Sequence, residues 1–314
     1  MAPTKTIIFG PTGSIGSATS LTAHSKGADI IFAMRDTSKS IPNLTPEAEN
    51  SGHYTRIQAD LTSPSSVLEA VTKTGAKRAF LYLMFGSPDN QRASIEGLKK
   101  GGVEFVVFLS SGGVHDGALE DVPSRDFISW SHAQVEINLR DVFGEKGYVA
   151  VRPKYFATNS LGWKPMIAAG EVRILHPEAQ WDWITPKDIG LVCGRLLVDG
   201  FEVVGGRNWV RLSGPELISQ KGAIETIGKA LGKEIKVTGI GEEEYLEVLI
   251  KFAHMPEVVA KNFVRVLNGR MAGDDGVYDE EGYAEEVGNV MKYGGKKPTT
   301  FEEWVAENKE AFLV

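Results

Sequence analysis

The sequence predicts a doubly wound α/β fold, in which helices cover both faces of a parallel sheet. Six apolar runs of strand length alternate with helix-like segments through the first half of the 314-residue chain. The runs lack polar alternation, as in Phe105-Val106-Val107-Phe108-Leu109, and this is expected where both faces of a sheet are covered. The carboxyl ends of such strands form one edge, where ligands bind. The expected strands are residues 6–9, 30–34, 54–59, 79–84, 105–110 and 148–151.

The first strand runs directly into three glycines spaced three residues apart, Gly10, Gly13 and Gly16. Glycine allows positive φ and the close approach of a phosphate, and the free amides at the start of the next helix attract anions. Ordinary glycine-rich turns can look alike, so the context matters. A second strand follows after one helix length, as in a Rossmann fold. We therefore expect this loop to hold a dinucleotide pyrophosphate, together with its other members Thr12, Ser14 and Ile15.

The residue that ends the second strand, Arg35, indicates NADP(H) as the cofactor. A carboxylate at this position would favour NAD, whereas arginine offers a planar cation to a 2′-phosphate. Ser38 and Lys39 follow closely enough to assist. Asp36 leaves a second interpretation open, because it would reach a ribose if the turn were shifted by one residue.

Composition points to small-molecule partners. The chain has 34 Lys and Arg against 41 Asp and Glu, a formal charge of −7, and no basic run stands out, so neither nucleic acid nor an anionic membrane is indicated. No apolar run approaches the roughly 20 residues of a membrane helix, and with strand one beginning almost at once we expect a cytoplasmic protein. The six histidines show no ligand spacing, so no metal site is expected. Cys193 lies in an apolar helical run and is interpreted as a buried structural thiol.

We expect residues 1–155 to form the dinucleotide-binding domain and 156–314 mainly a substrate-binding lobe, with about 180–200 returning to the first domain. The second half is richer in aromatic residues. Thr185, Pro186 and Asp188 read as a helix start, which makes Asp188 a cap and not a catalytic acid. Residues 242–253 and 256–267 have the apolar spacing of amphipathic helices. The acidic stretch 274–286 is expected to be a solvated face or loop, and 301–312 a closing helix.

Five separated stretches carry a resemblance to a known family. They are 10–16, 34–36, 60–61, 152–159 and 185–189. In these stretches the chain resembles the NmrA-like group of atypical short-chain dehydrogenases, related to isoflavone reductase-like enzymes. The resemblance implies that the glycine loop holds the pyrophosphate, that Arg35 grips the 2′-phosphate and that Asp60 and Leu61 flank the adenine. It also implies a nicotinamide and substrate side lined by Met84, Phe85, Tyr155 and Phe156.

The departure from the family pattern concerns catalysis. Most short-chain dehydrogenases use a tyrosine followed four residues later by a lysine, which lowers the pKa of the phenol. By register with Glu136, these positions are Ile128 and His132 here. A Tyr-x-x-x-Lys spacing occurs only at 293–297, where two intervening glycines oppose a helix. His132 is therefore a candidate general acid or cofactor-ribose contact, or else a space-filling residue bonded to Glu136.

Other candidates lie near the same edge of the sheet. Ser110 and Ser111 end the fifth strand, where a hydroxyl can contact the cofactor or polarise a substrate, or can satisfy backbone groups. Tyr155 can replace the missing proton donor or pack in the core. His115 and Asp116 follow in a glycine-rich loop and can reach substrate from above, or be merely solvated.

These features lead to two competing functions. The first is an NADPH-dependent reductase of a bulky, apolar small molecule, acting on a C=N, C=O or activated C=C bond in alkaloid or phenolic biosynthesis, with or without cyclisation of the product. An iminium substrate would need no acid, which would explain the missing tyrosine and lysine. The second is a regulator that binds NADP(H) without turnover and reports to a transcription factor, its protein partner. The six tryptophans favour the enzyme, because they suggest a pocket for a further ligand.

Overall fold

The computed structural model describes residues 3–52, 54–114, 117–251, 255–272 and 278–313. Its larger lobe is built on a seven-stranded sheet in the order β3-β2-β1-β4-β5-β6-β9, and every pair in it is parallel. The predicted fold class is confirmed, and the six expected strands are all present. The strands are β1 (Lys5–Phe9), β2 (Asp29–Met34), β3 (Tyr54–Gln58), β4 (Arg78–Tyr82), β5 (Phe105–Leu109), β6 (Tyr148–Pro153) and β9 (Trp209–Leu212).

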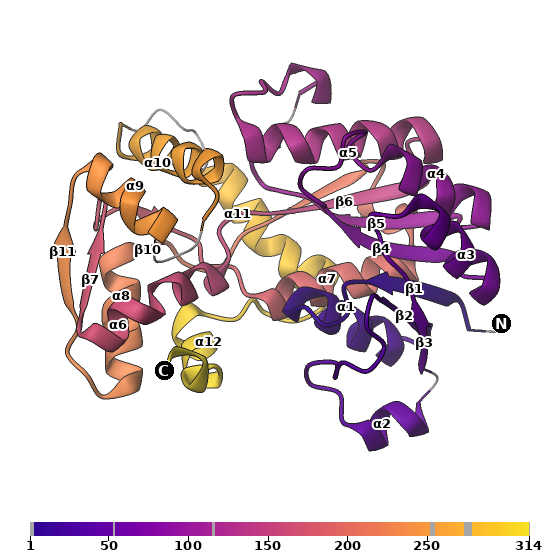
Figure 1. Cartoon of the computed structure of the whole chain (residues 1–314), viewed down its shortest axis with the longest axis horizontal. Helices are drawn as coiled ribbons and strands as arrows, with labels where there is room; N and C mark the ends of the chain where they lie inside the picture. Colours follow the sequence, from indigo (N-terminus) through magenta and orange to yellow (C-terminus); the bar gives the residue numbers. More distant parts are fainter. Residues whose placement is uncertain (1–2, 53, 115–116, 252–254, 273–277, 314) are drawn as a thin grey trace.

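Helices cover both faces of this sheet (Figure 1). Successive strand residues point to opposite faces, so Ile7 packs toward one set of helices and Ile8 toward the other. Cys193 is fully buried on the second face, and burial raises the pKa of its thiol. One face carries α3 (Pro64–Thr74), α4 (Arg92–Gly101) and α5 (Phe127–Phe143); the other carries α1 (Ser14–Ser25) and α7 (Pro186–Asp199).

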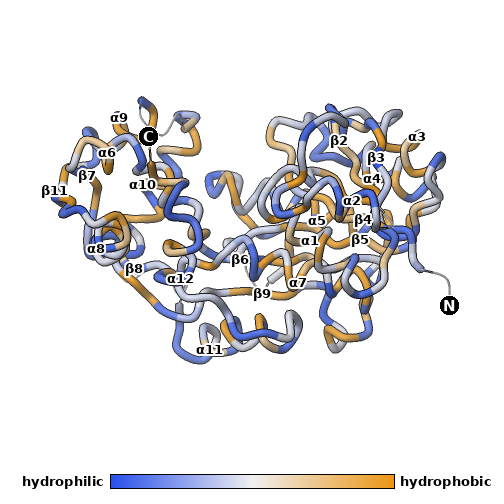
Figure 2. Tube along the Cα trace, turned by 90° about the horizontal axis from the view of Figure 1, so that it is seen from below, coloured by the Kyte–Doolittle hydropathy of each residue, from blue (hydrophilic) through white to orange (hydrophobic). Residues whose placement is uncertain are grey.

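The smaller lobe has its own hydrophobic core and two short sheets. Figure 2 shows hydrophobic stretches along the interior of both lobes and hydrophilic ones along the outer loops. The sheets pair β7 (Glu171–Ile174) with β11 (Lys236–Gly239) and β8 (Gln180–Trp181) with β10 (Ile218–Ser219). The helices are α6 (Lys164–Ala169), α8 (Gln220–Leu231), α9 (Glu242–Lys251), α10 (Glu257–Ala272) and α12 (Phe301–Glu307).

The chain returns to the large sheet more than once. Helix α7 packs against α1, and Thr185 caps it as expected, accepting a hydrogen bond from the Asp188 amide at 3.2 Å. Strand β9 and helix α11 (Glu280–Asn289) also join this lobe, and neither was expected there. The acidic stretch 274–286 was expected to be mostly a solvated face or loop, and its residues 280–285 are exposed or half-buried on α11, but Glu286 is buried. In the described residues, no helix is long and apolar enough to cross a membrane.

Candidate functional site

The glycine loop forms a tight turn at the carboxyl end of β1. Gly10 has φ +70°, and its carbonyl accepts the Gly13 amide at 3.1 Å. Gly16 packs so closely that a Cβ there would overlap the Gly10 carbonyl. Helix α1 starts at Ser14 with no side-chain cap on its first turn, so amides and the positive end of the helix dipole face outward. Thr12, Gly13 and Ser14 are exposed and Ile15 is half-buried, as a phosphate cradle requires.

A cavity of about 460 Å³ lies between the carboxyl ends of β2 and β3 and helix α3, and its lining includes Arg35 and Asp60. Arg35 is exposed at the end of β2. The Asp60 carboxylate accepts the Thr62 amide at 2.9 Å and the Thr62 hydroxyl at 2.7 Å, and these bonds hold its pKa below the ordinary value. The side chain of Leu61 is buried in the core, so only its backbone can flank a bound base. The remaining lining residues are Ile57, Gln58, Ala59, Ser66, Glu69, Ala70 and Lys73.

The turn after Arg35 is held by its own side chains. The Asp36 carboxylate accepts the Ser38 amide at 2.9 Å and the Ser38 hydroxyl at 2.6 Å, which lowers the pKa of Asp36. Both residues are thus engaged within the turn. Lys39 is exposed, with no hydrogen bond or ion pair from its ammonium to another described residue. This geometry leaves the side chains of Arg35 and Lys39 exposed on either side of the turn.

Beyond β4, a loop carries Met84 and Phe85 toward the space between the lobes. Gln91, buried and at φ +64°, receives the Met84 amide on its side-chain oxygen at 2.7 Å. Phe85 is 54% exposed, stacks on Phe127 at 5.8 Å and meets the His132 ring edge-on at 6.2 Å. The sequence analysis did not identify Gln91. The turn-forming residues before it indicate a loop, which a side chain such as that of Gln91 can hold in place.

Ser110 belongs to a buried ion-pair cluster. Arg152 donates to both carboxylate oxygens of Glu136, at 3.0 and 2.6 Å, and Ser110 donates to the same carboxylate at 2.5 Å. The expected hydrogen bond from His132 to Glu136 is wrong, because Glu136 binds Arg152 and Ser110 instead. The Ser111 oxygen accepts the Gly113 amide at 3.2 Å, and its proton is not donated to another described residue. Ser110 has therefore committed its proton to Glu136.

His132 is held as a neutral acceptor. Its Nδ1 lies 2.8 Å from the Ile128 carbonyl oxygen, one helical turn back. A carbonyl oxygen only accepts, so Nδ1 carries the proton and Nε2 is the acceptor. Burial lowers the pKa of the ring from 6.5 to about 4. At neutral pH His132 can receive a hydrogen bond from a ligand but has no proton to give from Nε2.

Tyr155 lies in the aromatic core of the smaller lobe. It stacks on Trp181 at 4.2 Å and meets Trp183 edge-on at 5.0 Å, and burial raises the pKa of its phenol well above the ordinary value. Its amide donates to Asp182 at 2.9 Å. Phe156 packs on the α1 and α7 face of the sheet. This burial makes Tyr155 a weak acid.

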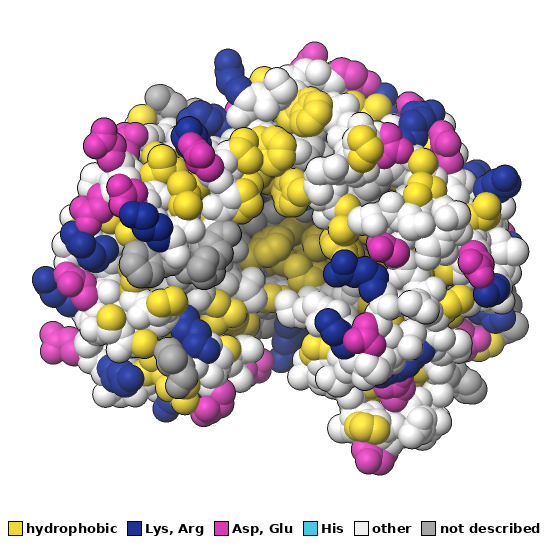
Figure 3. All heavy atoms as spheres, viewed as in Figure 1, with side chains coloured by type: hydrophobic (Ala, Val, Ile, Leu, Met, Phe, Trp, Pro, Cys, Tyr) yellow, Lys and Arg dark blue, Asp and Glu magenta, His cyan; other side chains and the backbone are white. Residues whose placement is uncertain are grey.

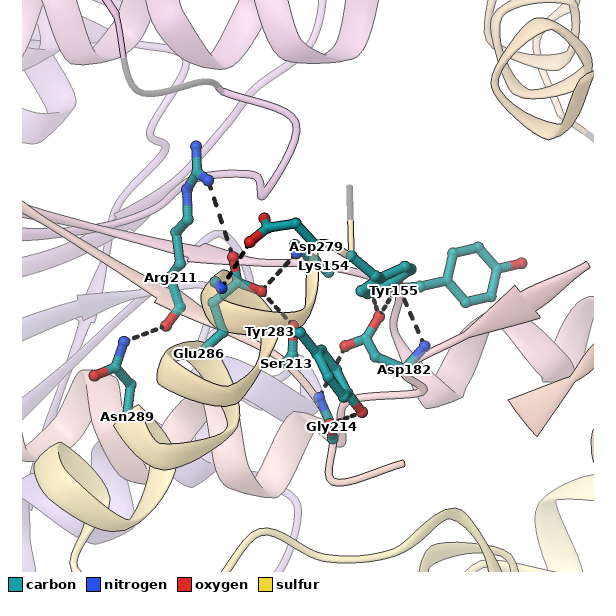
Figure 4. A network of polar contacts seen from close by, with 12 residues as sticks. Lys154, Tyr155, Asp182, Arg211, Ser213, Gly214, Asp279, Tyr283, Glu286 and Asn289 are labelled. Carbon is teal, nitrogen blue, oxygen red and sulfur yellow. Dashed lines mark hydrogen bonds and ion pairs between the residues drawn. The ribbon is translucent and has the colours of Figure 1, made fainter. Parts of the chain in front are cut away.

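A buried polar network behind these residues ties β6, β9 and α11 together (Figure 4). The Lys154 ammonium lies 2.6 Å from a Glu286 carboxylate oxygen, which also accepts the Ser213 hydroxyl at 2.6 Å. The stem of Lys154 packs over Gly112, where a Cβ would lie 2.6 Å from its Cγ. Sequence reasoning missed this network, because its partners are far apart along the chain.

The two lobes enclose a hollow whose visible floor is hydrophobic (Figure 3). Arg265 of α10 and Asp126, just before α5, form an ion pair of 2.8 Å between the lobes.

Tyr293, from the Tyr-x-x-x-Lys spacing, packs with the α1 and α7 core and lies in a π-helical turn. His115 and Asp116 lie outside the described residues. No cluster of three or more metal-ligating side chains was found within the described ranges.

The fold and the glycine loop define a dinucleotide-binding α/β protein of the Rossmann class. The model of the NmrA-like family matches residues 3–305, and the chain belongs to this family. The expected family resemblance is confirmed.

Two relatives and two solved structures illustrate this membership. The chain is 39% identical over 318 aligned positions to nitrogen metabolite regulation-like protein bik4 of Gibberella fujikuroi, covering 96% of this chain and 95% of that one. It is 29% identical to a (4-alkanoyl-5-oxo-2,5-dihydrofuran-3-yl)methyl phosphate reductase of Streptomyces griseus, covering 72% and 73%. The Escherichia coli quinone oxidoreductase QOR2 in complex with NADPH superposes with a TM-score of 0.71 at 20% identity, covering 96% and 99%. The Citrobacter triphenylmethane reductase with NADP(H) gives 0.68 at 15%, covering 97% and 99%.

Proposed function

We propose that this chain is an NADPH-dependent reductase of a bulky, largely apolar small molecule. The observation that carries the proposal is the uncapped start of α1 after β1, together with the exposed Arg35 at the end of the neighbouring strand β2. The crystallised neighbours that contain NADPH or NADP(H), and the Streptomyces relative that is named a reductase, support it. The hydrophobic floor between the lobes favours an apolar substrate (Figure 3).

The cofactor is NADP(H), held along the carboxyl edge of the sheet. The amides of Ser14 and Ile15, in the first turn of α1, bind its pyrophosphate, and Arg35 with Lys39 neutralises its 2′-phosphate. The cavity beside Asp60 takes the adenine. Once bound, the cofactor supplies a hydride from the nicotinamide C4 to a C=N, C=O or activated C=C carbon.

The residues around the substrate orient it and exclude water. Met84 and Phe85 provide an apolar wall near the nicotinamide, and Phe156 lies at its edge. His132 accepts a hydrogen bond at Nε2 from a ribose or substrate donor, so it positions the ligand and does not act as the general acid. The Ser111 hydroxyl donates to a substrate acceptor. Tyr155 lines the substrate side, and its raised pKa makes it a poor proton donor.

This set of residues suits a substrate that arrives already protonated. An iminium carbon accepts hydride and becomes a neutral amine without any further proton. We therefore favour an iminium of an alkaloid, and next a phenolic carbonyl or enone, as the substrate in specialised natural-product biosynthesis. Cyclisation of the reduced product inside the apolar hollow is compatible with this chemistry.

The first test is mass spectrometry of small molecules released from the purified, denatured protein, followed by titration with NADPH and NADH. Bound NADP(H) and a clear preference for NADPH are expected. Turnover with NADPH deuterated at the transferred C4 position should then place the label in a product. An unlabelled product would remove the reductase proposal, and absence of dinucleotide binding would remove the cofactor as well.

A regulator is the second candidate, favoured by the name of the Gibberella relative. Such a protein would bind NADP(H) and pass its redox state to a transcription factor without turnover. Affinity capture of a stable protein partner, with no NADPH consumed across imines, enones and quinones, would select the regulator. NADPH consumption with one of these substrate classes would select the enzyme.

A further inference from the structure

A partly buried ion pair at the edge of the large sheet holds the turn that follows Arg35. Arg56 lies on the edge strand β3, and its guanidinium pairs with both oxygens of Glu49, at 2.5 Å from Nε and 2.8 Å from Nη2. Glu49 comes from the short helix α2 (Pro46–Ser51). The Nη1 group of Arg56 donates to the carbonyls of Thr37 at 2.5 Å and Lys39 at 2.7 Å. One side chain therefore joins α2, β3 and the turn.

The geometry leaves Arg56 little capacity to bind a ligand itself. A guanidinium has five N–H donors. Two are used by Glu49 and two by the backbone carbonyls, which leaves a single donor on Nη2. The carbonyls that it binds flank Ser38, whose hydroxyl and amide close the turn onto Asp36. Arg56 thus determines the path of the backbone between Arg35 and Lys39.

We infer that the Arg56–Glu49 pair is a positioning clamp for NADP(H) recognition. It holds the turn in the shape that presents Arg35 and Lys39 to the 2′-phosphate, without contacting the phosphate. The inference rests on the proposed role of Arg35. It adds that the nucleotide preference depends on an acidic residue of α2, even though that residue repels a phosphate.

Glu49→Gln separates the clamp from simple electrostatics by the sign of its effect. If only charge mattered, removing an anion near the site would strengthen the binding of a 2′-phosphate. The clamp predicts the reverse, because glutamine cannot hold the guanidinium with two charged oxygens. Glu47→Gln is the matched control. Glu47 is exposed on the same helix, and its substitution removes the same charge. Arg56→Lys keeps the positive charge but loses the planar fork.

The experiment is calorimetric titration of the full-length variants with adenosine 2′,5′-bisphosphate and, in parallel, with 5′-AMP. These probes report the 2′-phosphate contribution without any turnover. We expect Glu49→Gln and Arg56→Lys to weaken the bisphosphate about threefold to tenfold, the loss of one or two hydrogen bonds, with little change for 5′-AMP. Glu47→Gln should leave the bisphosphate unchanged or slightly tighter.

Arg35→Ala distinguishes a failure of the proposed role of Arg35 from a failure of the proposed clamp. A loss of preference for the bisphosphate in this variant supports the proposed role of Arg35, and in that background Glu49→Gln should have only the smaller effect that acts through Lys39. Binding by Glu49→Gln as tight as, or tighter than, that of the unchanged protein overturns the clamp while Arg35 stands. Unchanged preference in Arg35→Ala overturns the role of Arg35 and the clamp with it. Because Arg56→Lys retains the charge, it also serves if Glu49→Gln fails to fold.

Discussion

The neutral state of His132 makes a quantitative prediction about stability and pH. The pKa of its ring is about 4 in the folded chain against 6.5 in an unfolded one. The unfolded state therefore binds a proton first as the pH falls, and the histidine destabilises the fold between pH 6.5 and 4. Linkage gives a loss of about 2 kcal/mol at pH 5, approaching a limit of about 3 kcal/mol below pH 4.

The assay is urea unfolding of the unchanged chain and of His132→Gln from pH 7.5 to pH 4. The other five histidines are common to both proteins, so the difference between the two curves isolates His132. The unchanged chain should lose about 2 kcal/mol more than the variant between pH 7 and pH 5. NMR of the ring should show Nδ1 protonated and Nε2 bare at neutral pH. Parallel stability curves, or a ring that titrates near 6.5, would refute the neutral-acceptor argument.

Three further predictions concern the cofactor site and its support. Arg35→Ala should weaken the binding of NADPH by about 1.5 to 3 kcal/mol and leave the binding of NADH nearly unchanged. Equal weakening of both nucleotides in a titration would contradict the 2′-phosphate role of Arg35. Glu136→Ala should lower the free energy of unfolding by about 3 to 5 kcal/mol, because it removes the carboxylate that pairs with the buried Arg152, whereas Glu257→Ala in an exposed pair should cost about 1 kcal/mol or less. Gly16→Ala should reduce dinucleotide binding and cost about 1 to 3 kcal/mol of stability, since its Cβ would overlap the Gly10 carbonyl. Gly13→Ala, whose Cβ would lie 3.5 Å from the same oxygen, should be as stable as the unchanged chain, and equal losses in the two variants would contradict the packing argument.

The sequence was informative wherever the determining contacts are local. Apolar runs bounded by turns identified six strands, and the glycine spacing located the tight turn between β1 and α1. The cap at Thr185 was also visible, because its partner lies three residues away. Local patterns such as these depend on backbone geometry and on the periodicity of side chains, so they can be read from neighbouring letters.

Local patterns were less informative about β9 and α11. Strand β9 spans only Trp209–Leu212 and lies in the aromatic-rich second half of the chain, where a substrate-binding lobe was expected. The acidic character of 274–286 suggested a solvated segment, yet Glu286 is buried opposite Lys154. A buried charge needs partners that compensate it. One partner of Glu286 is Ser213, which lies 73 residues away in the sequence.

Short apolar and glycine patterns predicted the parallel sheet and the family, and both predictions are confirmed, while phosphate binding by the glycine turn stays a prediction. Only the tertiary structure decided the protonation of His132, the pairing of Glu136 with Arg152 and Ser110, and the clamp on the turn after Arg35. The physical reason is that desolvation and ion pairing depend on which side chains meet across the fold. Glu136 is flanked by partners 16 and 26 residues away, and the choice between them and His132 belongs to three-dimensional packing.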